Sequence, residues 1–199
     1  MLTDHIGAVC FPGVMALRLI GRLAFPIYCF LLAQGLRHTR SHSKYVLRLV
    51  ILAVLSELPF DLALYGSFSW AHQNVMLTLI LGASAVLLLG RVSHPLVKSL
   101  LILPFFVVAE LLHTDYGGYG VLLVVLFSVT EHRLWQTVGL ALIYLLMHGF
   151  APPLFAVAAM IPISMYSGKK ISRKFSAQLA MNLFYPVHLT LLWILGRLI

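Results

Sequence analysis

Charge is scarce in this 199-residue chain, and acidic residues are scarcest of all. Only 10% of the residues are charged, 61% are hydrophobic, and the mean hydropathy is +0.97. This composition argues against a soluble domain, because such a domain could not hydrate its surface. Apolar runs recur from the first residue to the last, which also argues against a soluble domain on a single anchor. The sequence therefore predicts an integral membrane protein.

Several motifs are also missing. The two cysteines, Cys10 and Cys29, lie in apolar runs without the spacing of a zinc or redox pair. There is no Walker motif, GxGxxG segment, serine elbow or metal-binding pattern of histidines and acids, so those sites are not expected. No internal repeat suggests an inverted-repeat transporter, and no low-complexity linker divides the chain. Met1 leads into the chain without a basic segment, so no cleavable signal peptide is expected. We interpret residues 1–199 as one domain.

The apolar runs predict an all-helical integral membrane bundle of about eight or nine transmembrane helices, some short or broken. The expected helices cover residues 1–11, 19–36, 45–64, 74–90, 96–112, 120–130, 134–148, 153–165 and 179–198. The first, sixth and eighth are shorter than the roughly 20 residues that cross a bilayer. We therefore expect these three to be broken, re-entrant or shielded by protein.

Lys and Arg number 14 against six acidic residues, and most of them concentrate in alternate turns between the apolar runs. The basic turns contain Arg37, Arg40, Lys44, Arg48, Arg91, Lys98, Arg133, Lys169, Lys170, Arg173 and Lys174. Because short basic loops are translocated poorly, this pattern predicts a cytoplasmic amino terminus and, with nine spans, an external carboxyl terminus. Cations in short loops meet lipid headgroups, so the net charge of +8 does not predict a nucleic-acid partner.

Charged residues inside the apolar runs are candidates for a site, because burying them in a membrane is costly. Arg18 and Arg22 are four residues apart and share a helix face, as do Glu57 and Asp61. An antiparallel hairpin of the second and third runs would bring Arg22 beside both acids. Such an ion-pair cluster could stabilise the packing of two helices, or it could position a substrate.

Two histidines and two aspartates are candidates for proton transfer. Neighbouring residues on a helix diverge by about 100°, so Asp4 and His5 are expected to face different partners. A histidine near an acid in a low-dielectric bundle can act as a general base, but a carbonyl could equally satisfy it. His188 lies within the last run and could be catalytic or structural. Asp115 lies in a glycine-rich outer turn and could be a solvated turn residue.

The inner basic turns have two possible ligands. One rim includes His38, Thr39, Lys44 and Arg48, and the other includes Lys169 and Lys170. Lipid headgroups are the common partners of such loops. The phosphates of a nucleotide-like cofactor are the alternative.

Taken together, ten blocks of sequence resemble the TraX family of bacterial membrane proteins. The blocks are residues 1–7, including Asp4 and His5; 18–27; 35–39; 44–45; 48–49; 56–62, with Ser56-Glu57-Leu58-Pro59-Phe60-Asp61; 74–79; 115–117; 166–169; and 184–189, with Tyr185-Pro186-Val187-His188. Their order and spacing carry the resemblance, because no single block is specific. In one departure, only three residues precede the Asp-His pair, whereas family members carry more apolar residues there.

The resemblance implies a transmembrane acyltransferase of the bacterial inner membrane that uses acetyl-CoA as cosubstrate. It implies that the acceptor is an amine or hydroxyl on a peptide such as a pilin amino terminus, on a glycan or on a lipid, as expected of a protein of pilus conjugation systems. We expect His5 to take the acceptor's proton directly or to carry the acetyl group, with Asp4 supporting the site. The further catalytic candidates are His188, Asp115 and Glu57; the substrate-binding candidates are Arg18, Arg22, Asp61, Asn74 and Tyr185; and the acetyl-CoA candidates are His38, Thr39, Lys44, Arg48, Lys169 and Lys170. No metal is expected.

Two other functions fit the same residues. Acids, histidines and arginines within a membrane also form proton relays, so a proton-coupled small-solute transporter is the main alternative. The inner basic loops weigh slightly against it. A non-catalytic scaffold is the third reading, and it would tolerate removal of these charges.

Overall fold

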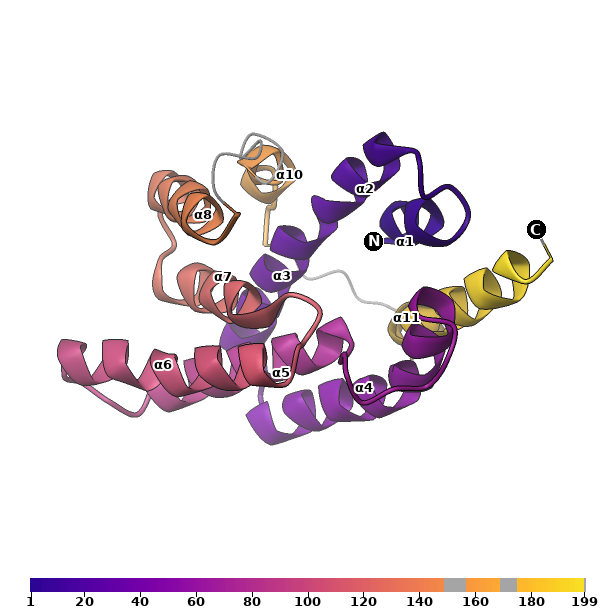
Figure 1. Cartoon of the computed structure of the whole chain (residues 1–199). Coiled ribbons are helices and arrows are strands. Elements are labelled where there is room, and N and C mark those ends of the chain that lie inside the picture. The colour runs from indigo at the N-terminus through magenta and orange to yellow at the C-terminus, as the bar shows by residue number, and fades with distance from the viewer. Residues whose placement is uncertain (149–156, 169–174, 199) are drawn as a thin grey trace.

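The computed structural model describes residues 1–148, 157–168 and 175–198, and these residues form helices without a β-strand (Figure 1). The helices are α1 (Leu2–Val9), α2 (Met15–Arg22), α3 (Ala24–His38), α4 (His42–Leu64), α5 (Val75–Leu89), α6 (Pro95–Leu111), α7 (Gly117–Val129), α8 (Arg133–His148), α10 (Met160–Ser164) and α11 (Phe175–Gly196). The all-helical prediction is confirmed for the described residues.

Local chemistry sets several helix ends. The Ser41 side chain accepts a hydrogen bond from the Lys44 amide and starts α4, and Asn74 accepts from the Met76 amide and starts α5. Pro95 occupies the first turn of α6, where a missing N–H costs nothing. The predicted helix at 19–36 begins earlier and is interrupted at Leu23 between α2 and α3. Pro26 explains the interruption, because it cannot donate to the carbonyl four residues earlier.

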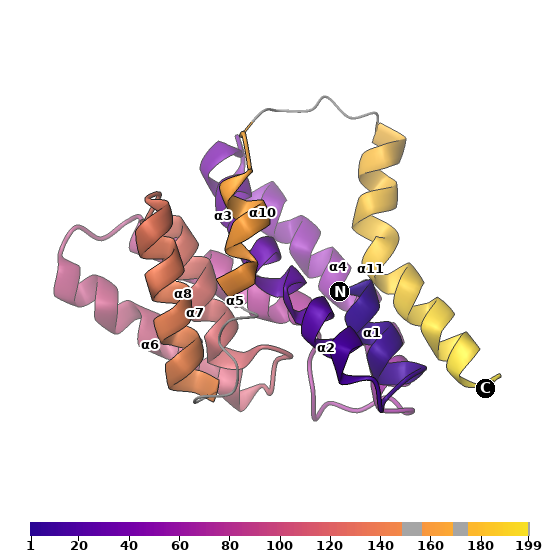
Figure 2. The same cartoon turned by 90° about the horizontal axis from the view of Figure 1, so that it is seen from above.

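The helices pack in two groups that meet around α3, α4 and α5. On one side α5, α6 and α7 lie together, and on the other α4 lies along α11 (Figure 1). Seen from above, α1 and α2 lie side by side, and α10 packs on α3 (Figure 2). Large side chains fill the centre, among them Phe30, Phe60, Phe127, Leu123 and Leu189. The first and last helices of the chain are in contact, so residues far apart in sequence can share a site.

The predicted pairing of the second and third apolar runs is wrong. The main neighbours of α4 are α11 and α5, whereas α3 packs mainly against α7. Although the short loop after His38 connects α3 to α4, α4 packs most extensively against α11. Sequence alone could not supply this partner, because α11 lies more than 100 residues away.

One stretch of the described residues has both the length and the apolar composition of a membrane span. It is the segment Met15–His38, which comprises α2 and α3 and has 24 residues and a mean hydropathy of 1.6. The shorter apolar helices are Val75–Leu89, Gly117–Val129, Arg133–Met147 and Asn182–Gly196. Of the predicted helix at 153–165, only its carboxyl-terminal part is described, and there α10 has five residues.

A backbone bridge joins two loops near the ends of α4 and α6. The backbone carbonyl of Gln73 accepts a hydrogen bond from the backbone amide of Asp115 at 2.9 Å. The backbone amide of Gln73 donates to the backbone carbonyl of His113 at 3.2 Å. Asp61, which is fully buried, accepts from the Ser69 amide at 2.9 Å and holds the same loop. These bonds fix the position of Asp115 before α7 begins.

Candidate functional site

The central feature of the site is a buried pair of histidines from the two ends of the chain. His5 Nδ1 on α1 lies 2.8 Å from His188 Nε2 on α11, and both side chains are at most 5% exposed. The ring planes are within 10° of each other. The expectation that Asp4 and His5 face different partners is therefore confirmed, and His188 is the partner of His5.

The hydrogen bonds assign the protons in the neutral pair. His188 Nδ1 lies 2.6 Å from the Phe184 carbonyl oxygen, which can only accept, so His188 Nδ1 donates. His188 Nε2 is then an acceptor, and His5 Nδ1 must donate to it. The lone pair of His5 is left on Nε2. This chain of hydrogen bonds therefore gives His5 one defined tautomer, with the basic nitrogen, Nε2, on the side away from His188.

Asp4 occupies the other side of α1 and pairs with Arg18. The Arg18 Nη1 atom lies 3.3 Å from Asp4 Oδ1 and donates to the Asp4 backbone oxygen at 3.3 Å. Helices α1 and α2 approach so closely that a Cβ atom at Gly21 would overlap the Asp4 backbone. Gly21 is thus needed to hold Asp4 and His5 in place.

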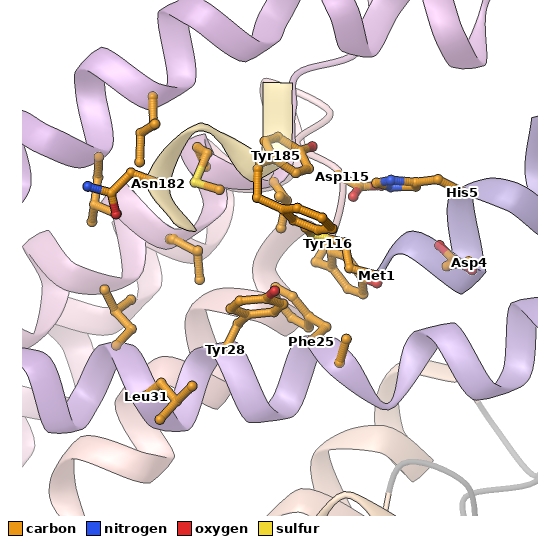
Figure 3. A pocket seen from close by; sticks show the side chains of 18 of the residues that line it. Met1, Asp4, His5, Phe25, Tyr28, Leu31, Asp115, Tyr116, Asn182 and Tyr185 are labelled. Atoms are coloured by element: carbon orange, nitrogen blue, oxygen red, sulfur yellow. The ribbon is translucent and has the colours of Figure 1, made fainter. Parts of the chain in front are cut away.

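Two cavities meet at this site. The smaller cavity, about 230 Å³, is lined by Met1, Asp4, His5, Gly21, Ala24, Phe25, Tyr28, Leu31, Leu32, Tyr45, Leu49, Leu52, Val75, Met76, Leu79, Asp115, Tyr116, Asn182, Phe184 and Tyr185. In Figure 3 the His5 ring points away from its helix, in the direction of Asp115 and Tyr116. Apolar side chains dominate this lining.

The larger cavity is more polar and measures about 490 Å³. Its lining includes Arg18, Arg22, Tyr65, His72, Glu110, His113, Tyr119 and Tyr144. Both cavities are lined by Asp4, Asp115, Phe25 and Tyr116, and the last two stack with ring centroids 3.5 Å apart. A ligand in each cavity could therefore approach the same few side chains from opposite sides.

Asp115 is the acid at the junction. By accessible surface Asp115 is exposed and lines both cavities, although protein atoms lie densely around its carboxyl group. Burial raises the pKa of the Asp115 carboxyl to about 6; Asp4 adds to the rise, and Arg18 and Arg22 oppose it. A carboxyl with this pKa can exchange a proton near neutral pH.

The predicted ion pair between Arg22 and the acids of α4 is wrong. Arg22 is exposed and lines the larger cavity. Asn74 donates its side-chain amide to Glu57, and Asp61 binds the Ser69 amide. Local donors therefore bind one oxygen of each carboxylate, while Glu57 Oε1 and Asp61 Oδ1 are buried without a hydrogen-bond partner.

Glu57, Asp61 and Asn74 do not line either of the two cavities. Asn74 also donates to the Ala53 carbonyl at 2.9 Å, so it links α5 to α4. The structure does not bring these three residues together with His5. By contrast Tyr185, another substrate-binding candidate, is buried with its ring centroid 6.1 Å from that of His5.

The predicted acetyl-CoA residues lie at the opposite end of α3. His38, Lys44 and Arg48 are exposed there, and Thr39 exchanges hydrogen bonds with Ser41 in the loop. Lys169 and Lys170 lie outside the described residues. Binding of acetyl-CoA by these side chains stays a prediction.

Sequence reasoning missed most residues of the smaller cavity's lining, among them four aromatic or amide side chains. Phe25, Tyr28, Tyr116 and Asn182 lie in or beside apolar runs, where aromatic and amide side chains usually serve packing. Tyr116 follows Asp115 in one of the blocks shared with the TraX family, which was a usable signal. Phe25 also lies in such a block, residues 18–27, whereas Tyr28 and Asn182 had no such signal, because only the packing of α3 and α11 places them at the cavity.

These features define a class: an all-helical bundle in which one member of a buried histidine pair lines a cavity that adjoins a second, more polar cavity. The chain belongs to the TraX protein family, which matches residues 1–196. It is 32% identical over 201 residues to the probable fimbrial assembly protein FimC, serogroup H1, of Dichelobacter nodosus, covering 88% of this chain and 81% of that protein. No solved structure matches the chain. The resemblance inferred from the sequence blocks is confirmed.

Proposed function

We propose that this protein is a membrane-embedded acetyltransferase that moves an acetyl group from acetyl-CoA to an amine or hydroxyl acceptor. The observation that carries the proposal is the His5–His188 pair, which leaves the lone pair of Nε2 on a histidine that lines the smaller cavity, next to Asp4, which lines both cavities. A base with one fixed tautomer, in a cavity that shares lining residues with a second cavity, suits transfer between two substrates.

The outer surface supports the membrane location. Helix α4 exposes Leu47, Val50, Ile51, Val54, Leu55 and Leu58, and α6, α8 and α11 expose similar sets of large apolar side chains. Exposed apolar area on this scale is unusual for a soluble monomer and is suited to lipid. The alternating basic turns favour the inner membrane of a bacterium, with several helices crossing.

In the proposed reaction His5 Nε2 accepts the proton of the attacking amine or hydroxyl. The acceptor's nitrogen or oxygen forms a bond to the acetyl carbon, the carbon–sulfur bond breaks, and the thiolate leaves. The His5 imidazolium returns the proton to the departing sulfur, so charge and atoms balance. Asp4 and Arg18 hold α1 against α2, while Asp115 lies at the junction and can exchange a proton with the acceptor.

A fimbrial or pilin-type subunit is the acceptor that the similarity to a fimbrial assembly protein favours. The similar Dichelobacter nodosus protein is named as a probable fimbrial assembly protein. A glycan or lipid of the envelope would use the same chemistry, since a hydroxyl can attack in place of an amine. The polar cavity, with its tyrosines and mixed charges, suits either acceptor group.

Radiolabelled acetyl transfer from acetyl-CoA to an envelope fraction tests the proposal. We expect His5→Ala to lower the rate by about 10²- to 10⁴-fold, because the general base is lost. His94→Ala is the matched control, since His94 is exposed and makes no side-chain cap at the start of α6. Near-normal transfer by His5→Ala would reject the assignment. Proton-driven solute uptake by vesicles without acetyl transfer would instead support the transporter.

A further inference from the structure

We propose that the smaller cavity is the groove for the long, unbranched arm of the thioester donor, with the arm running from the α3–α4 loop to His5. The proposal rests on the function proposed above and adds where the donor lies. The larger cavity is then left for the acceptor.

The cavity is elongated along two helices. Its lining extends from Ala24 to Leu32 on α3 and from Leu52 back to Tyr45 on α4. At 1.5 Å per residue, the α3 stretch is about 12 Å long. His5 and Asp115 lie at one end, whereas Leu31 and Asn182 lie toward the other (Figure 3). An acetyl group alone would leave most of this length empty.

The lining has the polarity that a linear arm of methylene and amide groups requires. Its walls are mainly aliphatic, from Leu49, Leu52 and Leu79, and suit methylene groups. Tyr28 and Asn182 add a hydroxyl and an amide, which can hydrogen-bond amide groups of the ligand. In Figure 3 both residues lie away from the His5 end.

Cations lie at the far end of the groove. Lys44 and Arg48 each directly precede a lining residue, Tyr45 and Leu49, and both are exposed. Among the described residues, no carboxylate lies within 4.0 Å of either cation. Arg37 differs, because Glu131 and two backbone carbonyls already engage its guanidinium. Lys44 and Arg48 can therefore bind the phosphates that a nucleotide-linked donor carries beyond its arm.

The test compares three acetyl thioesters that share a reacting end: acetyl-CoA, acetyl-pantetheine and S-acetyl-N-acetylcysteamine. Leu49→Trp narrows the groove from the α4 wall, one helical turn from Tyr45. We expect it to raise the KM for the two long donors by about tenfold or more and to leave kcat/KM for the short donor within about twofold. Leu47→Trp is the matched control, because Leu47 is 56% exposed and does not line the cavity. Leu31→Trp fills the groove from α3 if Leu49→Trp does not fold.

A second part of the experiment tests whether the cationic side chains bind the phosphates of the donor. Arg48→Gln should raise the KM for acetyl-CoA and leave that for acetyl-pantetheine unchanged, because acetyl-pantetheine lacks the nucleotide phosphates. Wild-type-like donor kinetics in both tryptophan variants would overturn the groove and leave the transferase function standing. If the tryptophan variants raised only the KM for the acceptor, the donor groove would also be overturned, because the acceptor would then occupy the smaller cavity. Absence of transfer from every donor by the natural protein would remove the proposed function itself.

Discussion

At the scale of single residues, His188 decides what His5 can do. The Phe184 carbonyl fixes the proton on His188 Nδ1, and His188 Nε2 then fixes the proton on His5 Nδ1. Without that acceptor the His5 ring could rotate or change tautomer, and its lone pair would no longer be held at the cavity. His188 is therefore a positioning residue, and the proposed base is His5.

Replacing His188 tests this dependence. His188→Gln places an amide oxygen near the position of Nε2, so we expect it to retain much of the transfer rate. His188→Ala removes the acceptor and should lower the rate by about 10²-fold. Nitrogen NMR of labelled histidine provides a readout independent of activity, because the tautomer signal of His5 should persist in the glutamine variant and become mixed in the alanine variant. Equal rates in the two variants would show that packing alone matters.

At the scale of helices, the site depends on the contact between α1 and α2. The turn from Cys10 to Val14 returns the chain, so that Gly21 meets the Asp4 backbone and the Met1 amine donates to the Gly21 carbonyl at 3.3 Å. This contact places Asp4 at both cavities and His5 against α11. An eight-residue helix such as α1 has little stability of its own, so its position comes from packing.

Gly21→Ala should disturb this contact. The added methyl would overlap the Asp4 backbone, which cannot shift like a flexible side chain. We expect a loss of about 1 to 3 kcal/mol in the free energy of unfolding and a marked loss of transfer. Gly13→Ala is the control, because a Cβ at Gly13 meets nothing within 4 Å. Thermal unfolding in detergent and the transfer assay would measure both effects, and an unchanged Gly21→Ala protein would contradict the packing argument.

At the scale of the whole molecule, the two cavities extend toward different loops of the bundle. The groove ends near the α3–α4 loop, which carries Arg40 and is followed by Lys44 in the first turn of α4. The larger cavity is lined by residues of the loops that precede α5 and α7, such as His72 and His113. If the basic loop faces the cytoplasm, the donor reaches its groove from there and the acceptor comes from the other side.

Cysteine labelling in intact cells tests this orientation. In a Cys10→Ser background, a cysteine at Ser67 should react with a membrane-impermeant maleimide, and one at Ser43 should react only after permeabilisation. Both positions are exposed, and the remaining Cys29 is fully buried. The physical reason is that the loop around Ser43 is rich in Lys and Arg and the loop around Ser67 has none. The reverse labelling pattern would refute the orientation and with it the cytosolic route of the donor.

Much of the element structure could be predicted from the sequence. Apolar runs gave the helices from α3 to α8 to within a few residues at most ends, because helix formation depends on local periodicity and on caps such as Ser41 and Asn74. The candidates Asp4, His5, Asp115 and His188 also proved to lie together around the cavities or in contact with a residue that does. The interruption at Leu23 was missed, although Pro26 was a local signal for it.

The sequence by itself determined that this chain forms apolar helices, that it belongs to the TraX family, and that a few titratable residues are enclosed among those helices. Only the tertiary structure decided that His5 bonds to His188, that Glu57 and Asp61 find local donors instead of Arg22, and that α11 lies on α4. The reason is physical: helices and caps arise from contacts a few residues apart, whereas these partners are up to 183 residues apart and are selected by packing of the whole bundle.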